Sequence, residues 1–155
     1  MPLDINKVAL FGVAGAVTDS AILIQSQTTA GATSIEFTSG ITDAYKQYVF
    51  AFYTVAPITN SEELQMITST DGGSSYGVTT TSTHFVAAHR VIWSTSTSLA
   101  YETSRDLAQS TSPHKLTQNM ANSTQSAGGN NTPAANFAGE FILYNPASTA
   151  YVKQW

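Results

Sequence analysis

The amino-acid sequence predicts an all-β protein, an antiparallel β-sandwich or jelly-roll-like fold with long polar loops. Three observations lead to this prediction. Short apolar runs recur along the 155 residues, and several alternate polar with apolar side chains, which is the two-residue period of a half-buried strand. Clusters of Gly, Pro, Asn, Asp and Ser separate these runs. The sequence contains no long amphipathic helical pattern.

The N-terminal residues 1–20 are mildly apolar, and two interpretations remain open for them. They form either a first strand or an arm that docks onto another subunit, because Gly12 and Gly15 offer no side chain to pack. A strand is expected at 21–29. The remainder shows no internal repeat and no sign of a second domain, so we expect residues 21–155 to form a single β-sandwich domain.

The strongest strand signal covers residues 47–55. Both faces of this segment are apolar, so we expect a central strand that is covered on both sides. Pro57 ends it, because proline cannot donate a hydrogen bond to a neighbouring strand. One face carries Tyr48, Phe50, Phe52 and Thr54, and the other carries Val49, Ala51, Tyr53 and Val55.

Shorter elements are predicted around this strand. The alternating segment 34–38 is expected to be a strand, and 41–46 a short connector. Residues 62–70, with Leu64 and Met66 turned inward, and 76–83 are expected to pair as a hairpin. Its turn is Asp71-Gly72-Gly73, because glycine takes positive φ at no steric cost.

The C-terminal half contains further strand signals around a polar region. Residues 94–136 are low in complexity and form either a strand pair with long loops or a protruding excursion. The remaining predicted elements are strands at 85–93, 138–144 and 150–155, with a turn at 145–148.

Composition excludes several classes of function. Charged residues make up 10% of the chain, against about 25% in ordinary domains, and Ser and Thr together about a quarter. The net charge is −4 with six basic residues, so we expect no nucleic-acid partner. We expect no membrane partner, because no segment approaches the ~20 apolar residues of a membrane span and the start lacks a signal-peptide pattern. The absence of Cys excludes disulfides and thiolate chemistry.

We expect no metal site and no cofactor. His84 and His89 are five residues apart, which places them on opposite faces of one strand, and neither they nor His114 has the i, i+4 spacing of a helical zinc site. The segment 71–75 has some features of a calcium loop but lacks its alternating oxygen ligands, so a tight turn is the better interpretation.

We also expect no catalytic residues and no enzyme activity. The sequence has no Gly-x-Ser-x-Gly nucleophile elbow. A glycosidase needs two carboxylates facing one another across a cleft, and no such pair stands out among the ten acidic residues. Glu62 and Glu63 are adjacent and would point apart on a strand.

A series of strand and turn segments resembles a group of tailed-bacteriophage virion proteins that are described as tail-fibre or other structural proteins. The resemblance covers residues 20–155 and rests on Ile35–Ile41, Tyr45–Phe50, Pro57, Ser69–Tyr76, Phe141–Pro146 and Tyr151–Lys153. Members of that group continue past the Tyr-Val-Lys strand, whereas this sequence stops at Trp155. We therefore expect either a shorter member or part of a longer product, with the domain then incomplete at its C-terminus.

The resemblance implies a β-rich, oligomeric virion component that carries no enzymatic residues. We expect a surface-exposed tail-fibre or fibre-associated subunit, located in the virion, with other virion proteins and copies of itself as partners, a homotrimer being favoured. Two alternatives stay open: a capsid decoration (cement) protein, and a carbohydrate- or receptor-binding module that recognises a host-surface glycan.

Overall fold

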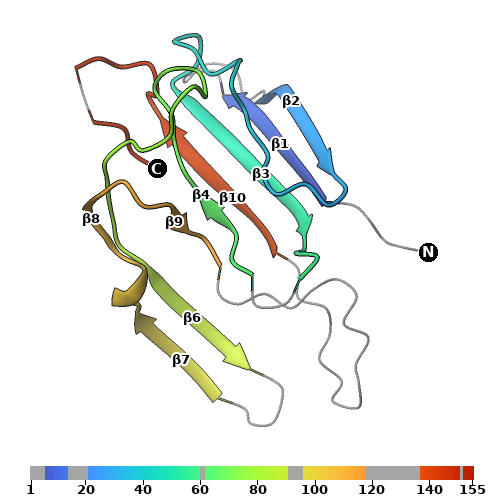
Figure 1. Ribbon diagram of the computed structural model, residues 1–155, viewed down its shortest axis with the longest axis vertical. Coiled ribbons are helices and arrows are strands. Elements are labelled where there is room, and N and C mark those ends of the chain that lie inside the picture. Colours follow the sequence, from blue (N-terminus) through green and yellow to red (C-terminus); the bar gives the residue numbers. More distant parts are fainter. Residues whose placement is uncertain (1–5, 14–20, 60–61, 91–95, 118–136, 151) are drawn as a thin grey trace.

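A computed structural model describes residues 6–13, 21–59, 62–90, 96–117, 137–150 and 152–155, whose regular secondary structure is almost entirely antiparallel strands joined by irregular segments (Figure 1). This confirms the all-β prediction. One short 3₁₀ turn, η1, covers Thr103–Arg105. The strands are β1 (Asn6–Val13), β2 (Ala21–Thr29), β3 (Gln47–Val55), β4 (Gln65–Met66), β5 (Thr80–Ser82), β6 (Phe85–Arg90), β7 (Ser96–Tyr101), β8 (Leu107–Ser110), β9 (His114–Lys115) and β10 (Phe137–Tyr144).

The largest sheet has the strand order β10-β3-β1-β2. β3 spans the predicted residues and is an interior strand, as its two apolar faces predicted. The segment 6–13 forms β1, which lies between β3 and β2 in the middle of the sheet. Residues 1–5 and 14–20 lie outside the described residues.

One face of this sheet, the inner face, carries the core. Leu10 and Tyr48 are fully buried, and Leu143 lies beside Tyr48 because the register pairs these two residues across β3 and β10. Side chains directly opposite one another in an antiparallel pair share a face. The segment between β2 and β3 crosses this face. Partly buried side chains packed against the core are Ile24, Phe37, Ile41, Tyr45, Phe50 and Phe141.

Tyr48 also holds the crossing segment by hydrogen bonds. The Thr42 amide donates to the Tyr48 hydroxyl at 2.9 Å, and that hydroxyl donates to the Thr42 carbonyl at 3.0 Å. Tyr45 packs edge-on against Tyr48 with ring centroids 5.7 Å apart. Gly12 gives the Tyr45 ring its space, because a Cβ on Gly12 would lie 2.6 Å from that ring.

The opposite, outer face of the sheet is apolar but only partly covered. Phe11, Val49 and Ile142 are paired across three strands and are half-buried. Ala51 on this face is buried, yet Tyr53, two residues along, is 49% exposed. The expectation that both faces of β3 are covered therefore holds for the inner face and only in part for the outer one.

The other strands form three two-stranded sheets, β4–β9, β5–β8 and β6–β7. Trp155 connects the first two to the large sheet: its ring lies 6.1 Å from Phe141 on the inner face, and it lines a pocket with Met66 of β4 and Thr80 of β5. The described sheets are open, so the sandwich or jelly-roll arrangement remains a proposal.

The segment 34–38 is not a strand, and this prediction was wrong. Its burial does alternate, but the alternation comes from packing across the inner face and not from pairing with a strand. Phe37 meets Phe50 edge-on with centroids 5.5 Å apart, and the Gln27 amide donates to the Glu36 carbonyl.

The predicted 62–83 hairpin was also wrong. The turn is present, with Gly72 and Gly73 at positive φ. The chain on either side of it, however, pairs with distant segments, β4 with β9 and β5 with β8. Leu64 and Met66 are half-buried, as expected for inward side chains.

Predictions for the C-terminal half had mixed outcomes. β6 and β10 confirm the strands predicted at 85–93 and 138–144 over their described parts, and a turn follows at 145–148. The region 94–136 contains β7, β8 and β9, while 118–136 lies outside the described residues. The predicted strand at 150–155 is wrong over most of its length, because its described residues form only one bridge, between Gln154 and Tyr144.

Replacing Leu10 tests the position of the core. Leu10→Ala should lower the free energy of unfolding by about 2–5 kcal/mol, because it leaves a cavity among fully packed side chains. The matched control Ile58→Ala, at a residue 62% exposed, should cost about 1 kcal/mol or less. Urea unfolding at one fixed protein concentration measures both values, and equal losses would place the core elsewhere.

Candidate functional site

The described structure brings together three polar side chains that are far apart in the sequence. Ser82 ends β5, His84 precedes β6 and His114 begins β9. The Ser82 hydroxyl and His114 Nδ1 lie 3.0 Å apart, and the rings of His84 and His114 are 6.3 Å apart. Sequence reasoning missed this cluster, because 32 residues separate Ser82 from His114 and only strand pairing brings them close.

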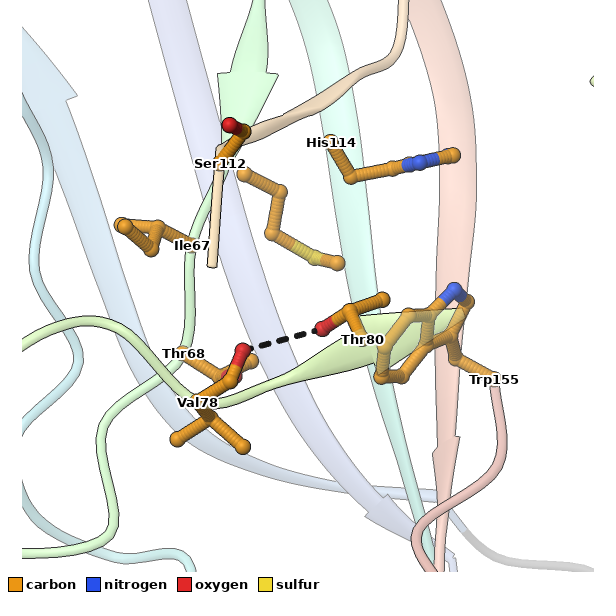
Figure 2. A pocket seen from close by; sticks show the side chains of 8 residues that line it. Ile67, Thr68, Val78, Thr80, Ser112, His114 and Trp155 are labelled. Atoms are coloured by element: carbon orange, nitrogen blue, oxygen red, sulfur yellow. Dashed lines mark hydrogen bonds between the residues drawn. The ribbon is translucent and has the colours of Figure 1, made fainter. Parts of the chain in front are cut away.

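His114 also lines a small pocket next to Trp155 (Figure 2). Thr80 donates a hydrogen bond to the Val78 carbonyl at 3.2 Å on the pocket wall. His114 is the one ionisable side chain among the lining residues. These are Met66, Ile67, Thr68, Val78, Thr80, Ser112, His114 and Trp155.

The Ser82–His114 contact has one element of a hydrolytic site and lacks the others. A serine nucleophile needs a histidine base that is in turn oriented by a third group. Within the described part of the chain, no carboxylate is hydrogen-bonded to His114. Burial and the neighbouring His84 lower the pKa of His114, which favours its neutral form. We interpret the pair as a polar contact that satisfies two half-buried groups.

His84 has a structural contact as well. Its backbone amide donates to the Asp106 carboxylate at 2.9 Å, and the Tyr101 hydroxyl donates to the same carboxylate. Asp106 thereby ties the start of β6 to the end of β7. The side chain of His89 lies outside the described residues.

Glu63 joins two cations in a charge network. Its carboxylate lies 3.0 Å from the Arg105 guanidinium and 2.9 Å from the Lys115 ammonium. The hydrogen bond from Lys115 is the main reason that the pKa of Glu63 is lowered, and Arg105 adds to it. Arg105 is buried and also donates to the Thr117 carbonyl. Glu62 instead accepts from the Thr59 hydroxyl, so the adjacent carboxylates have separate partners.

Asp71 organises the glycine turn. The Ser69 hydroxyl donates to its carboxylate at 2.6 Å, the Ser75 amide donates at 2.9 Å, and the Ser75 hydroxyl donates to the other oxygen. These hydrogen bonds lower the pKa of Asp71 to about 2. The oxygens of Asp71 thus accept hydrogen bonds within a tight turn. A tight turn is the interpretation that the sequence favoured over a calcium loop. Across the described ranges, no group of three or more His, Asp or Glu side chains suits a metal ion.

A further surface escaped sequence reasoning. β6 and β7 pair so that Phe85 faces Tyr101 and Ala87 faces Leu99 on one side of the ribbon. The Phe85 and Tyr101 rings lie 5.1 Å apart, and all four side chains are exposed. Leu99 and Tyr101 share one face of β7, which is a weak signal of such a surface, but sequence alone does not show which face meets solvent.

Comparisons with protein-family models, with curated proteins and with solved structures found no match. In the part of the chain that the structure describes, no helix has the length and apolar character to cross a membrane.

Titration of His114 tests the interpretation of the serine–histidine contact. Its pKa should lie below the ordinary value of 6.5, so the native state loses stability as pH falls through 6.5 toward the lower folded value. His84→Gln should raise the pKa of His114, because it removes the neighbouring charge, whereas Ser82→Ala should move it less. NMR of the imidazole signals measures both pKa changes. A pKa of His114 above 6.5 would contradict a half-buried ring whose neutral form is favoured.

Titration of Asp71 tests the turn. Its folded pKa is about 2 against 3.8 in the unfolded chain, so its stabilising contribution is present above pH 4 and is lost as pH falls toward 2. Ser69→Ala and Ser75→Ala should each move the carboxyl midpoint upward, because each removes a donor to the carboxylate. The control Ser104→Ala removes a hydroxyl beside Glu102 and should leave it unchanged. The ¹³C chemical shift of the Asp71 carboxyl reports the midpoint. A midpoint that neither Ser69→Ala nor Ser75→Ala changes would contradict this hydrogen-bonded turn.

Proposed function

We propose that the chain is a structural subunit of a bacteriophage virion, exposed on the particle as a tail-fibre or fibre-associated protein and assembled with copies of itself through β-rich contacts. The resemblance of residues 20–155 to phage structural proteins supports the virion assignment. The large apolar side chains that are exposed in the described residues support self-assembly.

The observation that carries the proposal of self-assembly is the distribution of apolar side chains. Among the described residues, the buried hydrophobic core is small and consists of Ala9, Leu10, Tyr48, Ala51 and Leu143. Large exposed apolar side chains are more numerous: Ile22, Leu23, Tyr53, Ile58, Ile67, Tyr76, Phe85, Leu99, Tyr101, Tyr144, Val152 and Trp155. Isolated exposed apolar residues are ordinary, but contiguous ones mark interaction surfaces.

The ionisable groups described above have structural partners, which suits a scaffold. Glu63 is paired with Arg105 and Lys115, Asp71 caps its turn, and Asp106 ties β6 to β7. We further infer that β4–β9 and β5–β8 form the second layer of a β-sandwich over the inner face, with Trp155 between the layers. Its contact with Phe141 supports this arrangement.

A carbohydrate-binding module is the second candidate, and one observation favours it. The rings of Phe85 and Tyr101 are exposed next to each other, and sugars stack on such rings. Glycan-array screening of the purified chain distinguishes the two candidates: a hit that disappears in Phe85→Ser would favour recognition of a host-surface glycan. A capsid decoration protein would assemble by the same contacts, and imaging of the particle separates head from tail.

The mass of the purified protein in solution tests the proposal. We expect light scattering after size exclusion at micromolar concentration to give a multiple of 16.4 kDa, three times that value for the favoured homotrimer. The assembly should persist at high salt, because few charged residues are available to hold it. A monomer at every concentration up to hundreds of micromolar would refute self-assembly.

A further inference from the structure

We propose that an open cleft at one end of the four-stranded sheet binds a neutral, hydroxyl-rich ligand, a sugar unit of a glycan. The cleft lies between residues 43–46, which lead into β3, and residues 145–150, which follow β10. Its volume is about 410 Å³, within the range of about 300–1,000 Å³ that small-molecule sites have. The inference goes beyond the proposed function, because assembly of subunits does not require the cleft.

The register of the sheet brings the two walls of the cleft together. Gln47 begins β3 and pairs with Tyr144, the last residue of β10. The chain before Gln47 and the chain after Tyr144 therefore leave the sheet next to each other. The Asn145 amide donates to the Lys46 carbonyl at 2.8 Å and joins the two walls directly.

Each wall also has hydrogen bonds of its own. On one side, the Tyr48 hydroxyl is hydrogen-bonded to both the amide and the carbonyl of Thr42. On the other side, the Ser148 amide donates to the Asn145 carbonyl at 3.1 Å, and the Ala150 amide donates to the Ser148 hydroxyl at 3.3 Å. A site that is fixed before binding loses little conformational freedom when the ligand arrives, which favours affinity.

The lining of the cleft is polar and contains one aromatic residue. Among the described residues that line it there is no Val, Leu, Ile, Met, Phe or Trp, so an apolar ligand would bury little apolar surface. Asp43 and Lys46 carry opposite charges, so the lining as a whole favours neither an anion nor a cation. The lining residues are Asp43, Tyr45, Lys46, Asn145, Ala147, Ser148, Thr149 and Ala150.

Several polar side chains of the cleft are available to a ligand. Asp43, Lys46 and Thr149 are exposed, and within the described part of the chain their side chains have no hydrogen-bonding or charged partner. The carboxylate accepts hydrogen bonds, the ammonium donates them, and the threonine hydroxyl does both. Sugar hydroxyls also donate and accept, so they match this mixture better than an ion does.

Tyr45 supplies the aromatic surface. Its ring is half-buried, lies over Gly12 and meets Tyr48 edge-on at an interplanar angle of 88°. These contacts fix the ring without a ligand. A tyrosine combines an apolar ring with a polar hydroxyl. The same combination is present in a sugar, where C–H groups and hydroxyls lie side by side.

An array of neutral and acidic glycans, screened with the purified chain, provides the first part of the test. We expect neutral glycans to bind. Asp43→Ala and Thr149→Ala should each raise the dissociation constant of the best neutral glycan by about tenfold, because each leaves a sugar hydroxyl without its partner. The matched controls Glu140→Ala and Thr70→Ala change exposed residues outside the cleft and should leave the constant unchanged.

Two further measurements locate the ligand and define its charge. In NMR titrations with the same glycan, the amide signals of residues 43–46 and 145–150 should shift most. The dissociation constant should change by less than about twofold between low and high salt, because a neutral ligand forms no ion pair that salt could screen. Far-UV circular dichroism establishes that each variant folds.

The other results overturn the inference and differ from a failure of assembly. An array on which no neutral glycan binds would refute it, whatever the mass of the protein in solution. Binding that Phe85→Ser abolishes and Asp43→Ala preserves would place the glycan on the Phe85 and Tyr101 rings instead. Binding of acidic glycans alone, weakened by salt, would refute a neutral ligand. A monomeric chain that binds neutral glycans in the cleft would refute self-assembly and support this inference.

Discussion

The common register of β1, β3 and β10 is the constraint on which the rest of the structure depends. It aligns Gly12, Tyr48 and Leu143 across three strands and puts Leu10 next to them. Tyr48 then binds the segment that crosses the inner face, and Gly12 leaves space for Tyr45 over the sheet. A slip of one residue in β3 would turn Tyr48 outward and bring Val49 to the core face, because side chains alternate along a strand.

The same register also leaves apolar side chains only partly covered on the outer face of the sheet. Phe11, Val49 and Ile142 fall in one row on the outer face, where nearby Tyr53 stays half-exposed. Large apolar side chains lie on both faces of this sheet, and the fully buried core is small. Apolar area therefore remains available for contacts between molecules. Low charge reinforces this tendency, since charged edges are a common defence against association.

Sequence reasoning predicted elements whose signal is local. The aromatic run 47–55 and the segment 137–144 are strands because their own residues favour that conformation, and the Asp71-Gly72-Gly73 turn forms because glycine permits positive φ. Pairing was less predictable. Residues 34–38 alternate like a strand but pack across a sheet, and Ser82 meets His114 only because β4–β9 and β5–β8 are long-range pairs. The exposure of the ribbon face likewise depends on where the rest of the chain lies.

The central claim is that surfaces left open in one chain are closed by another copy. Hydrogen–deuterium exchange, measured at concentrations below and above assembly, tests this most directly because it reports every amide in the same experiment. The account predicts slower exchange on assembly in β6, β7 and the exposed parts of β3 and β10, with the turn around Asp71 unchanged. Identical exchange at both concentrations, or slowing confined to other strands, would contradict it.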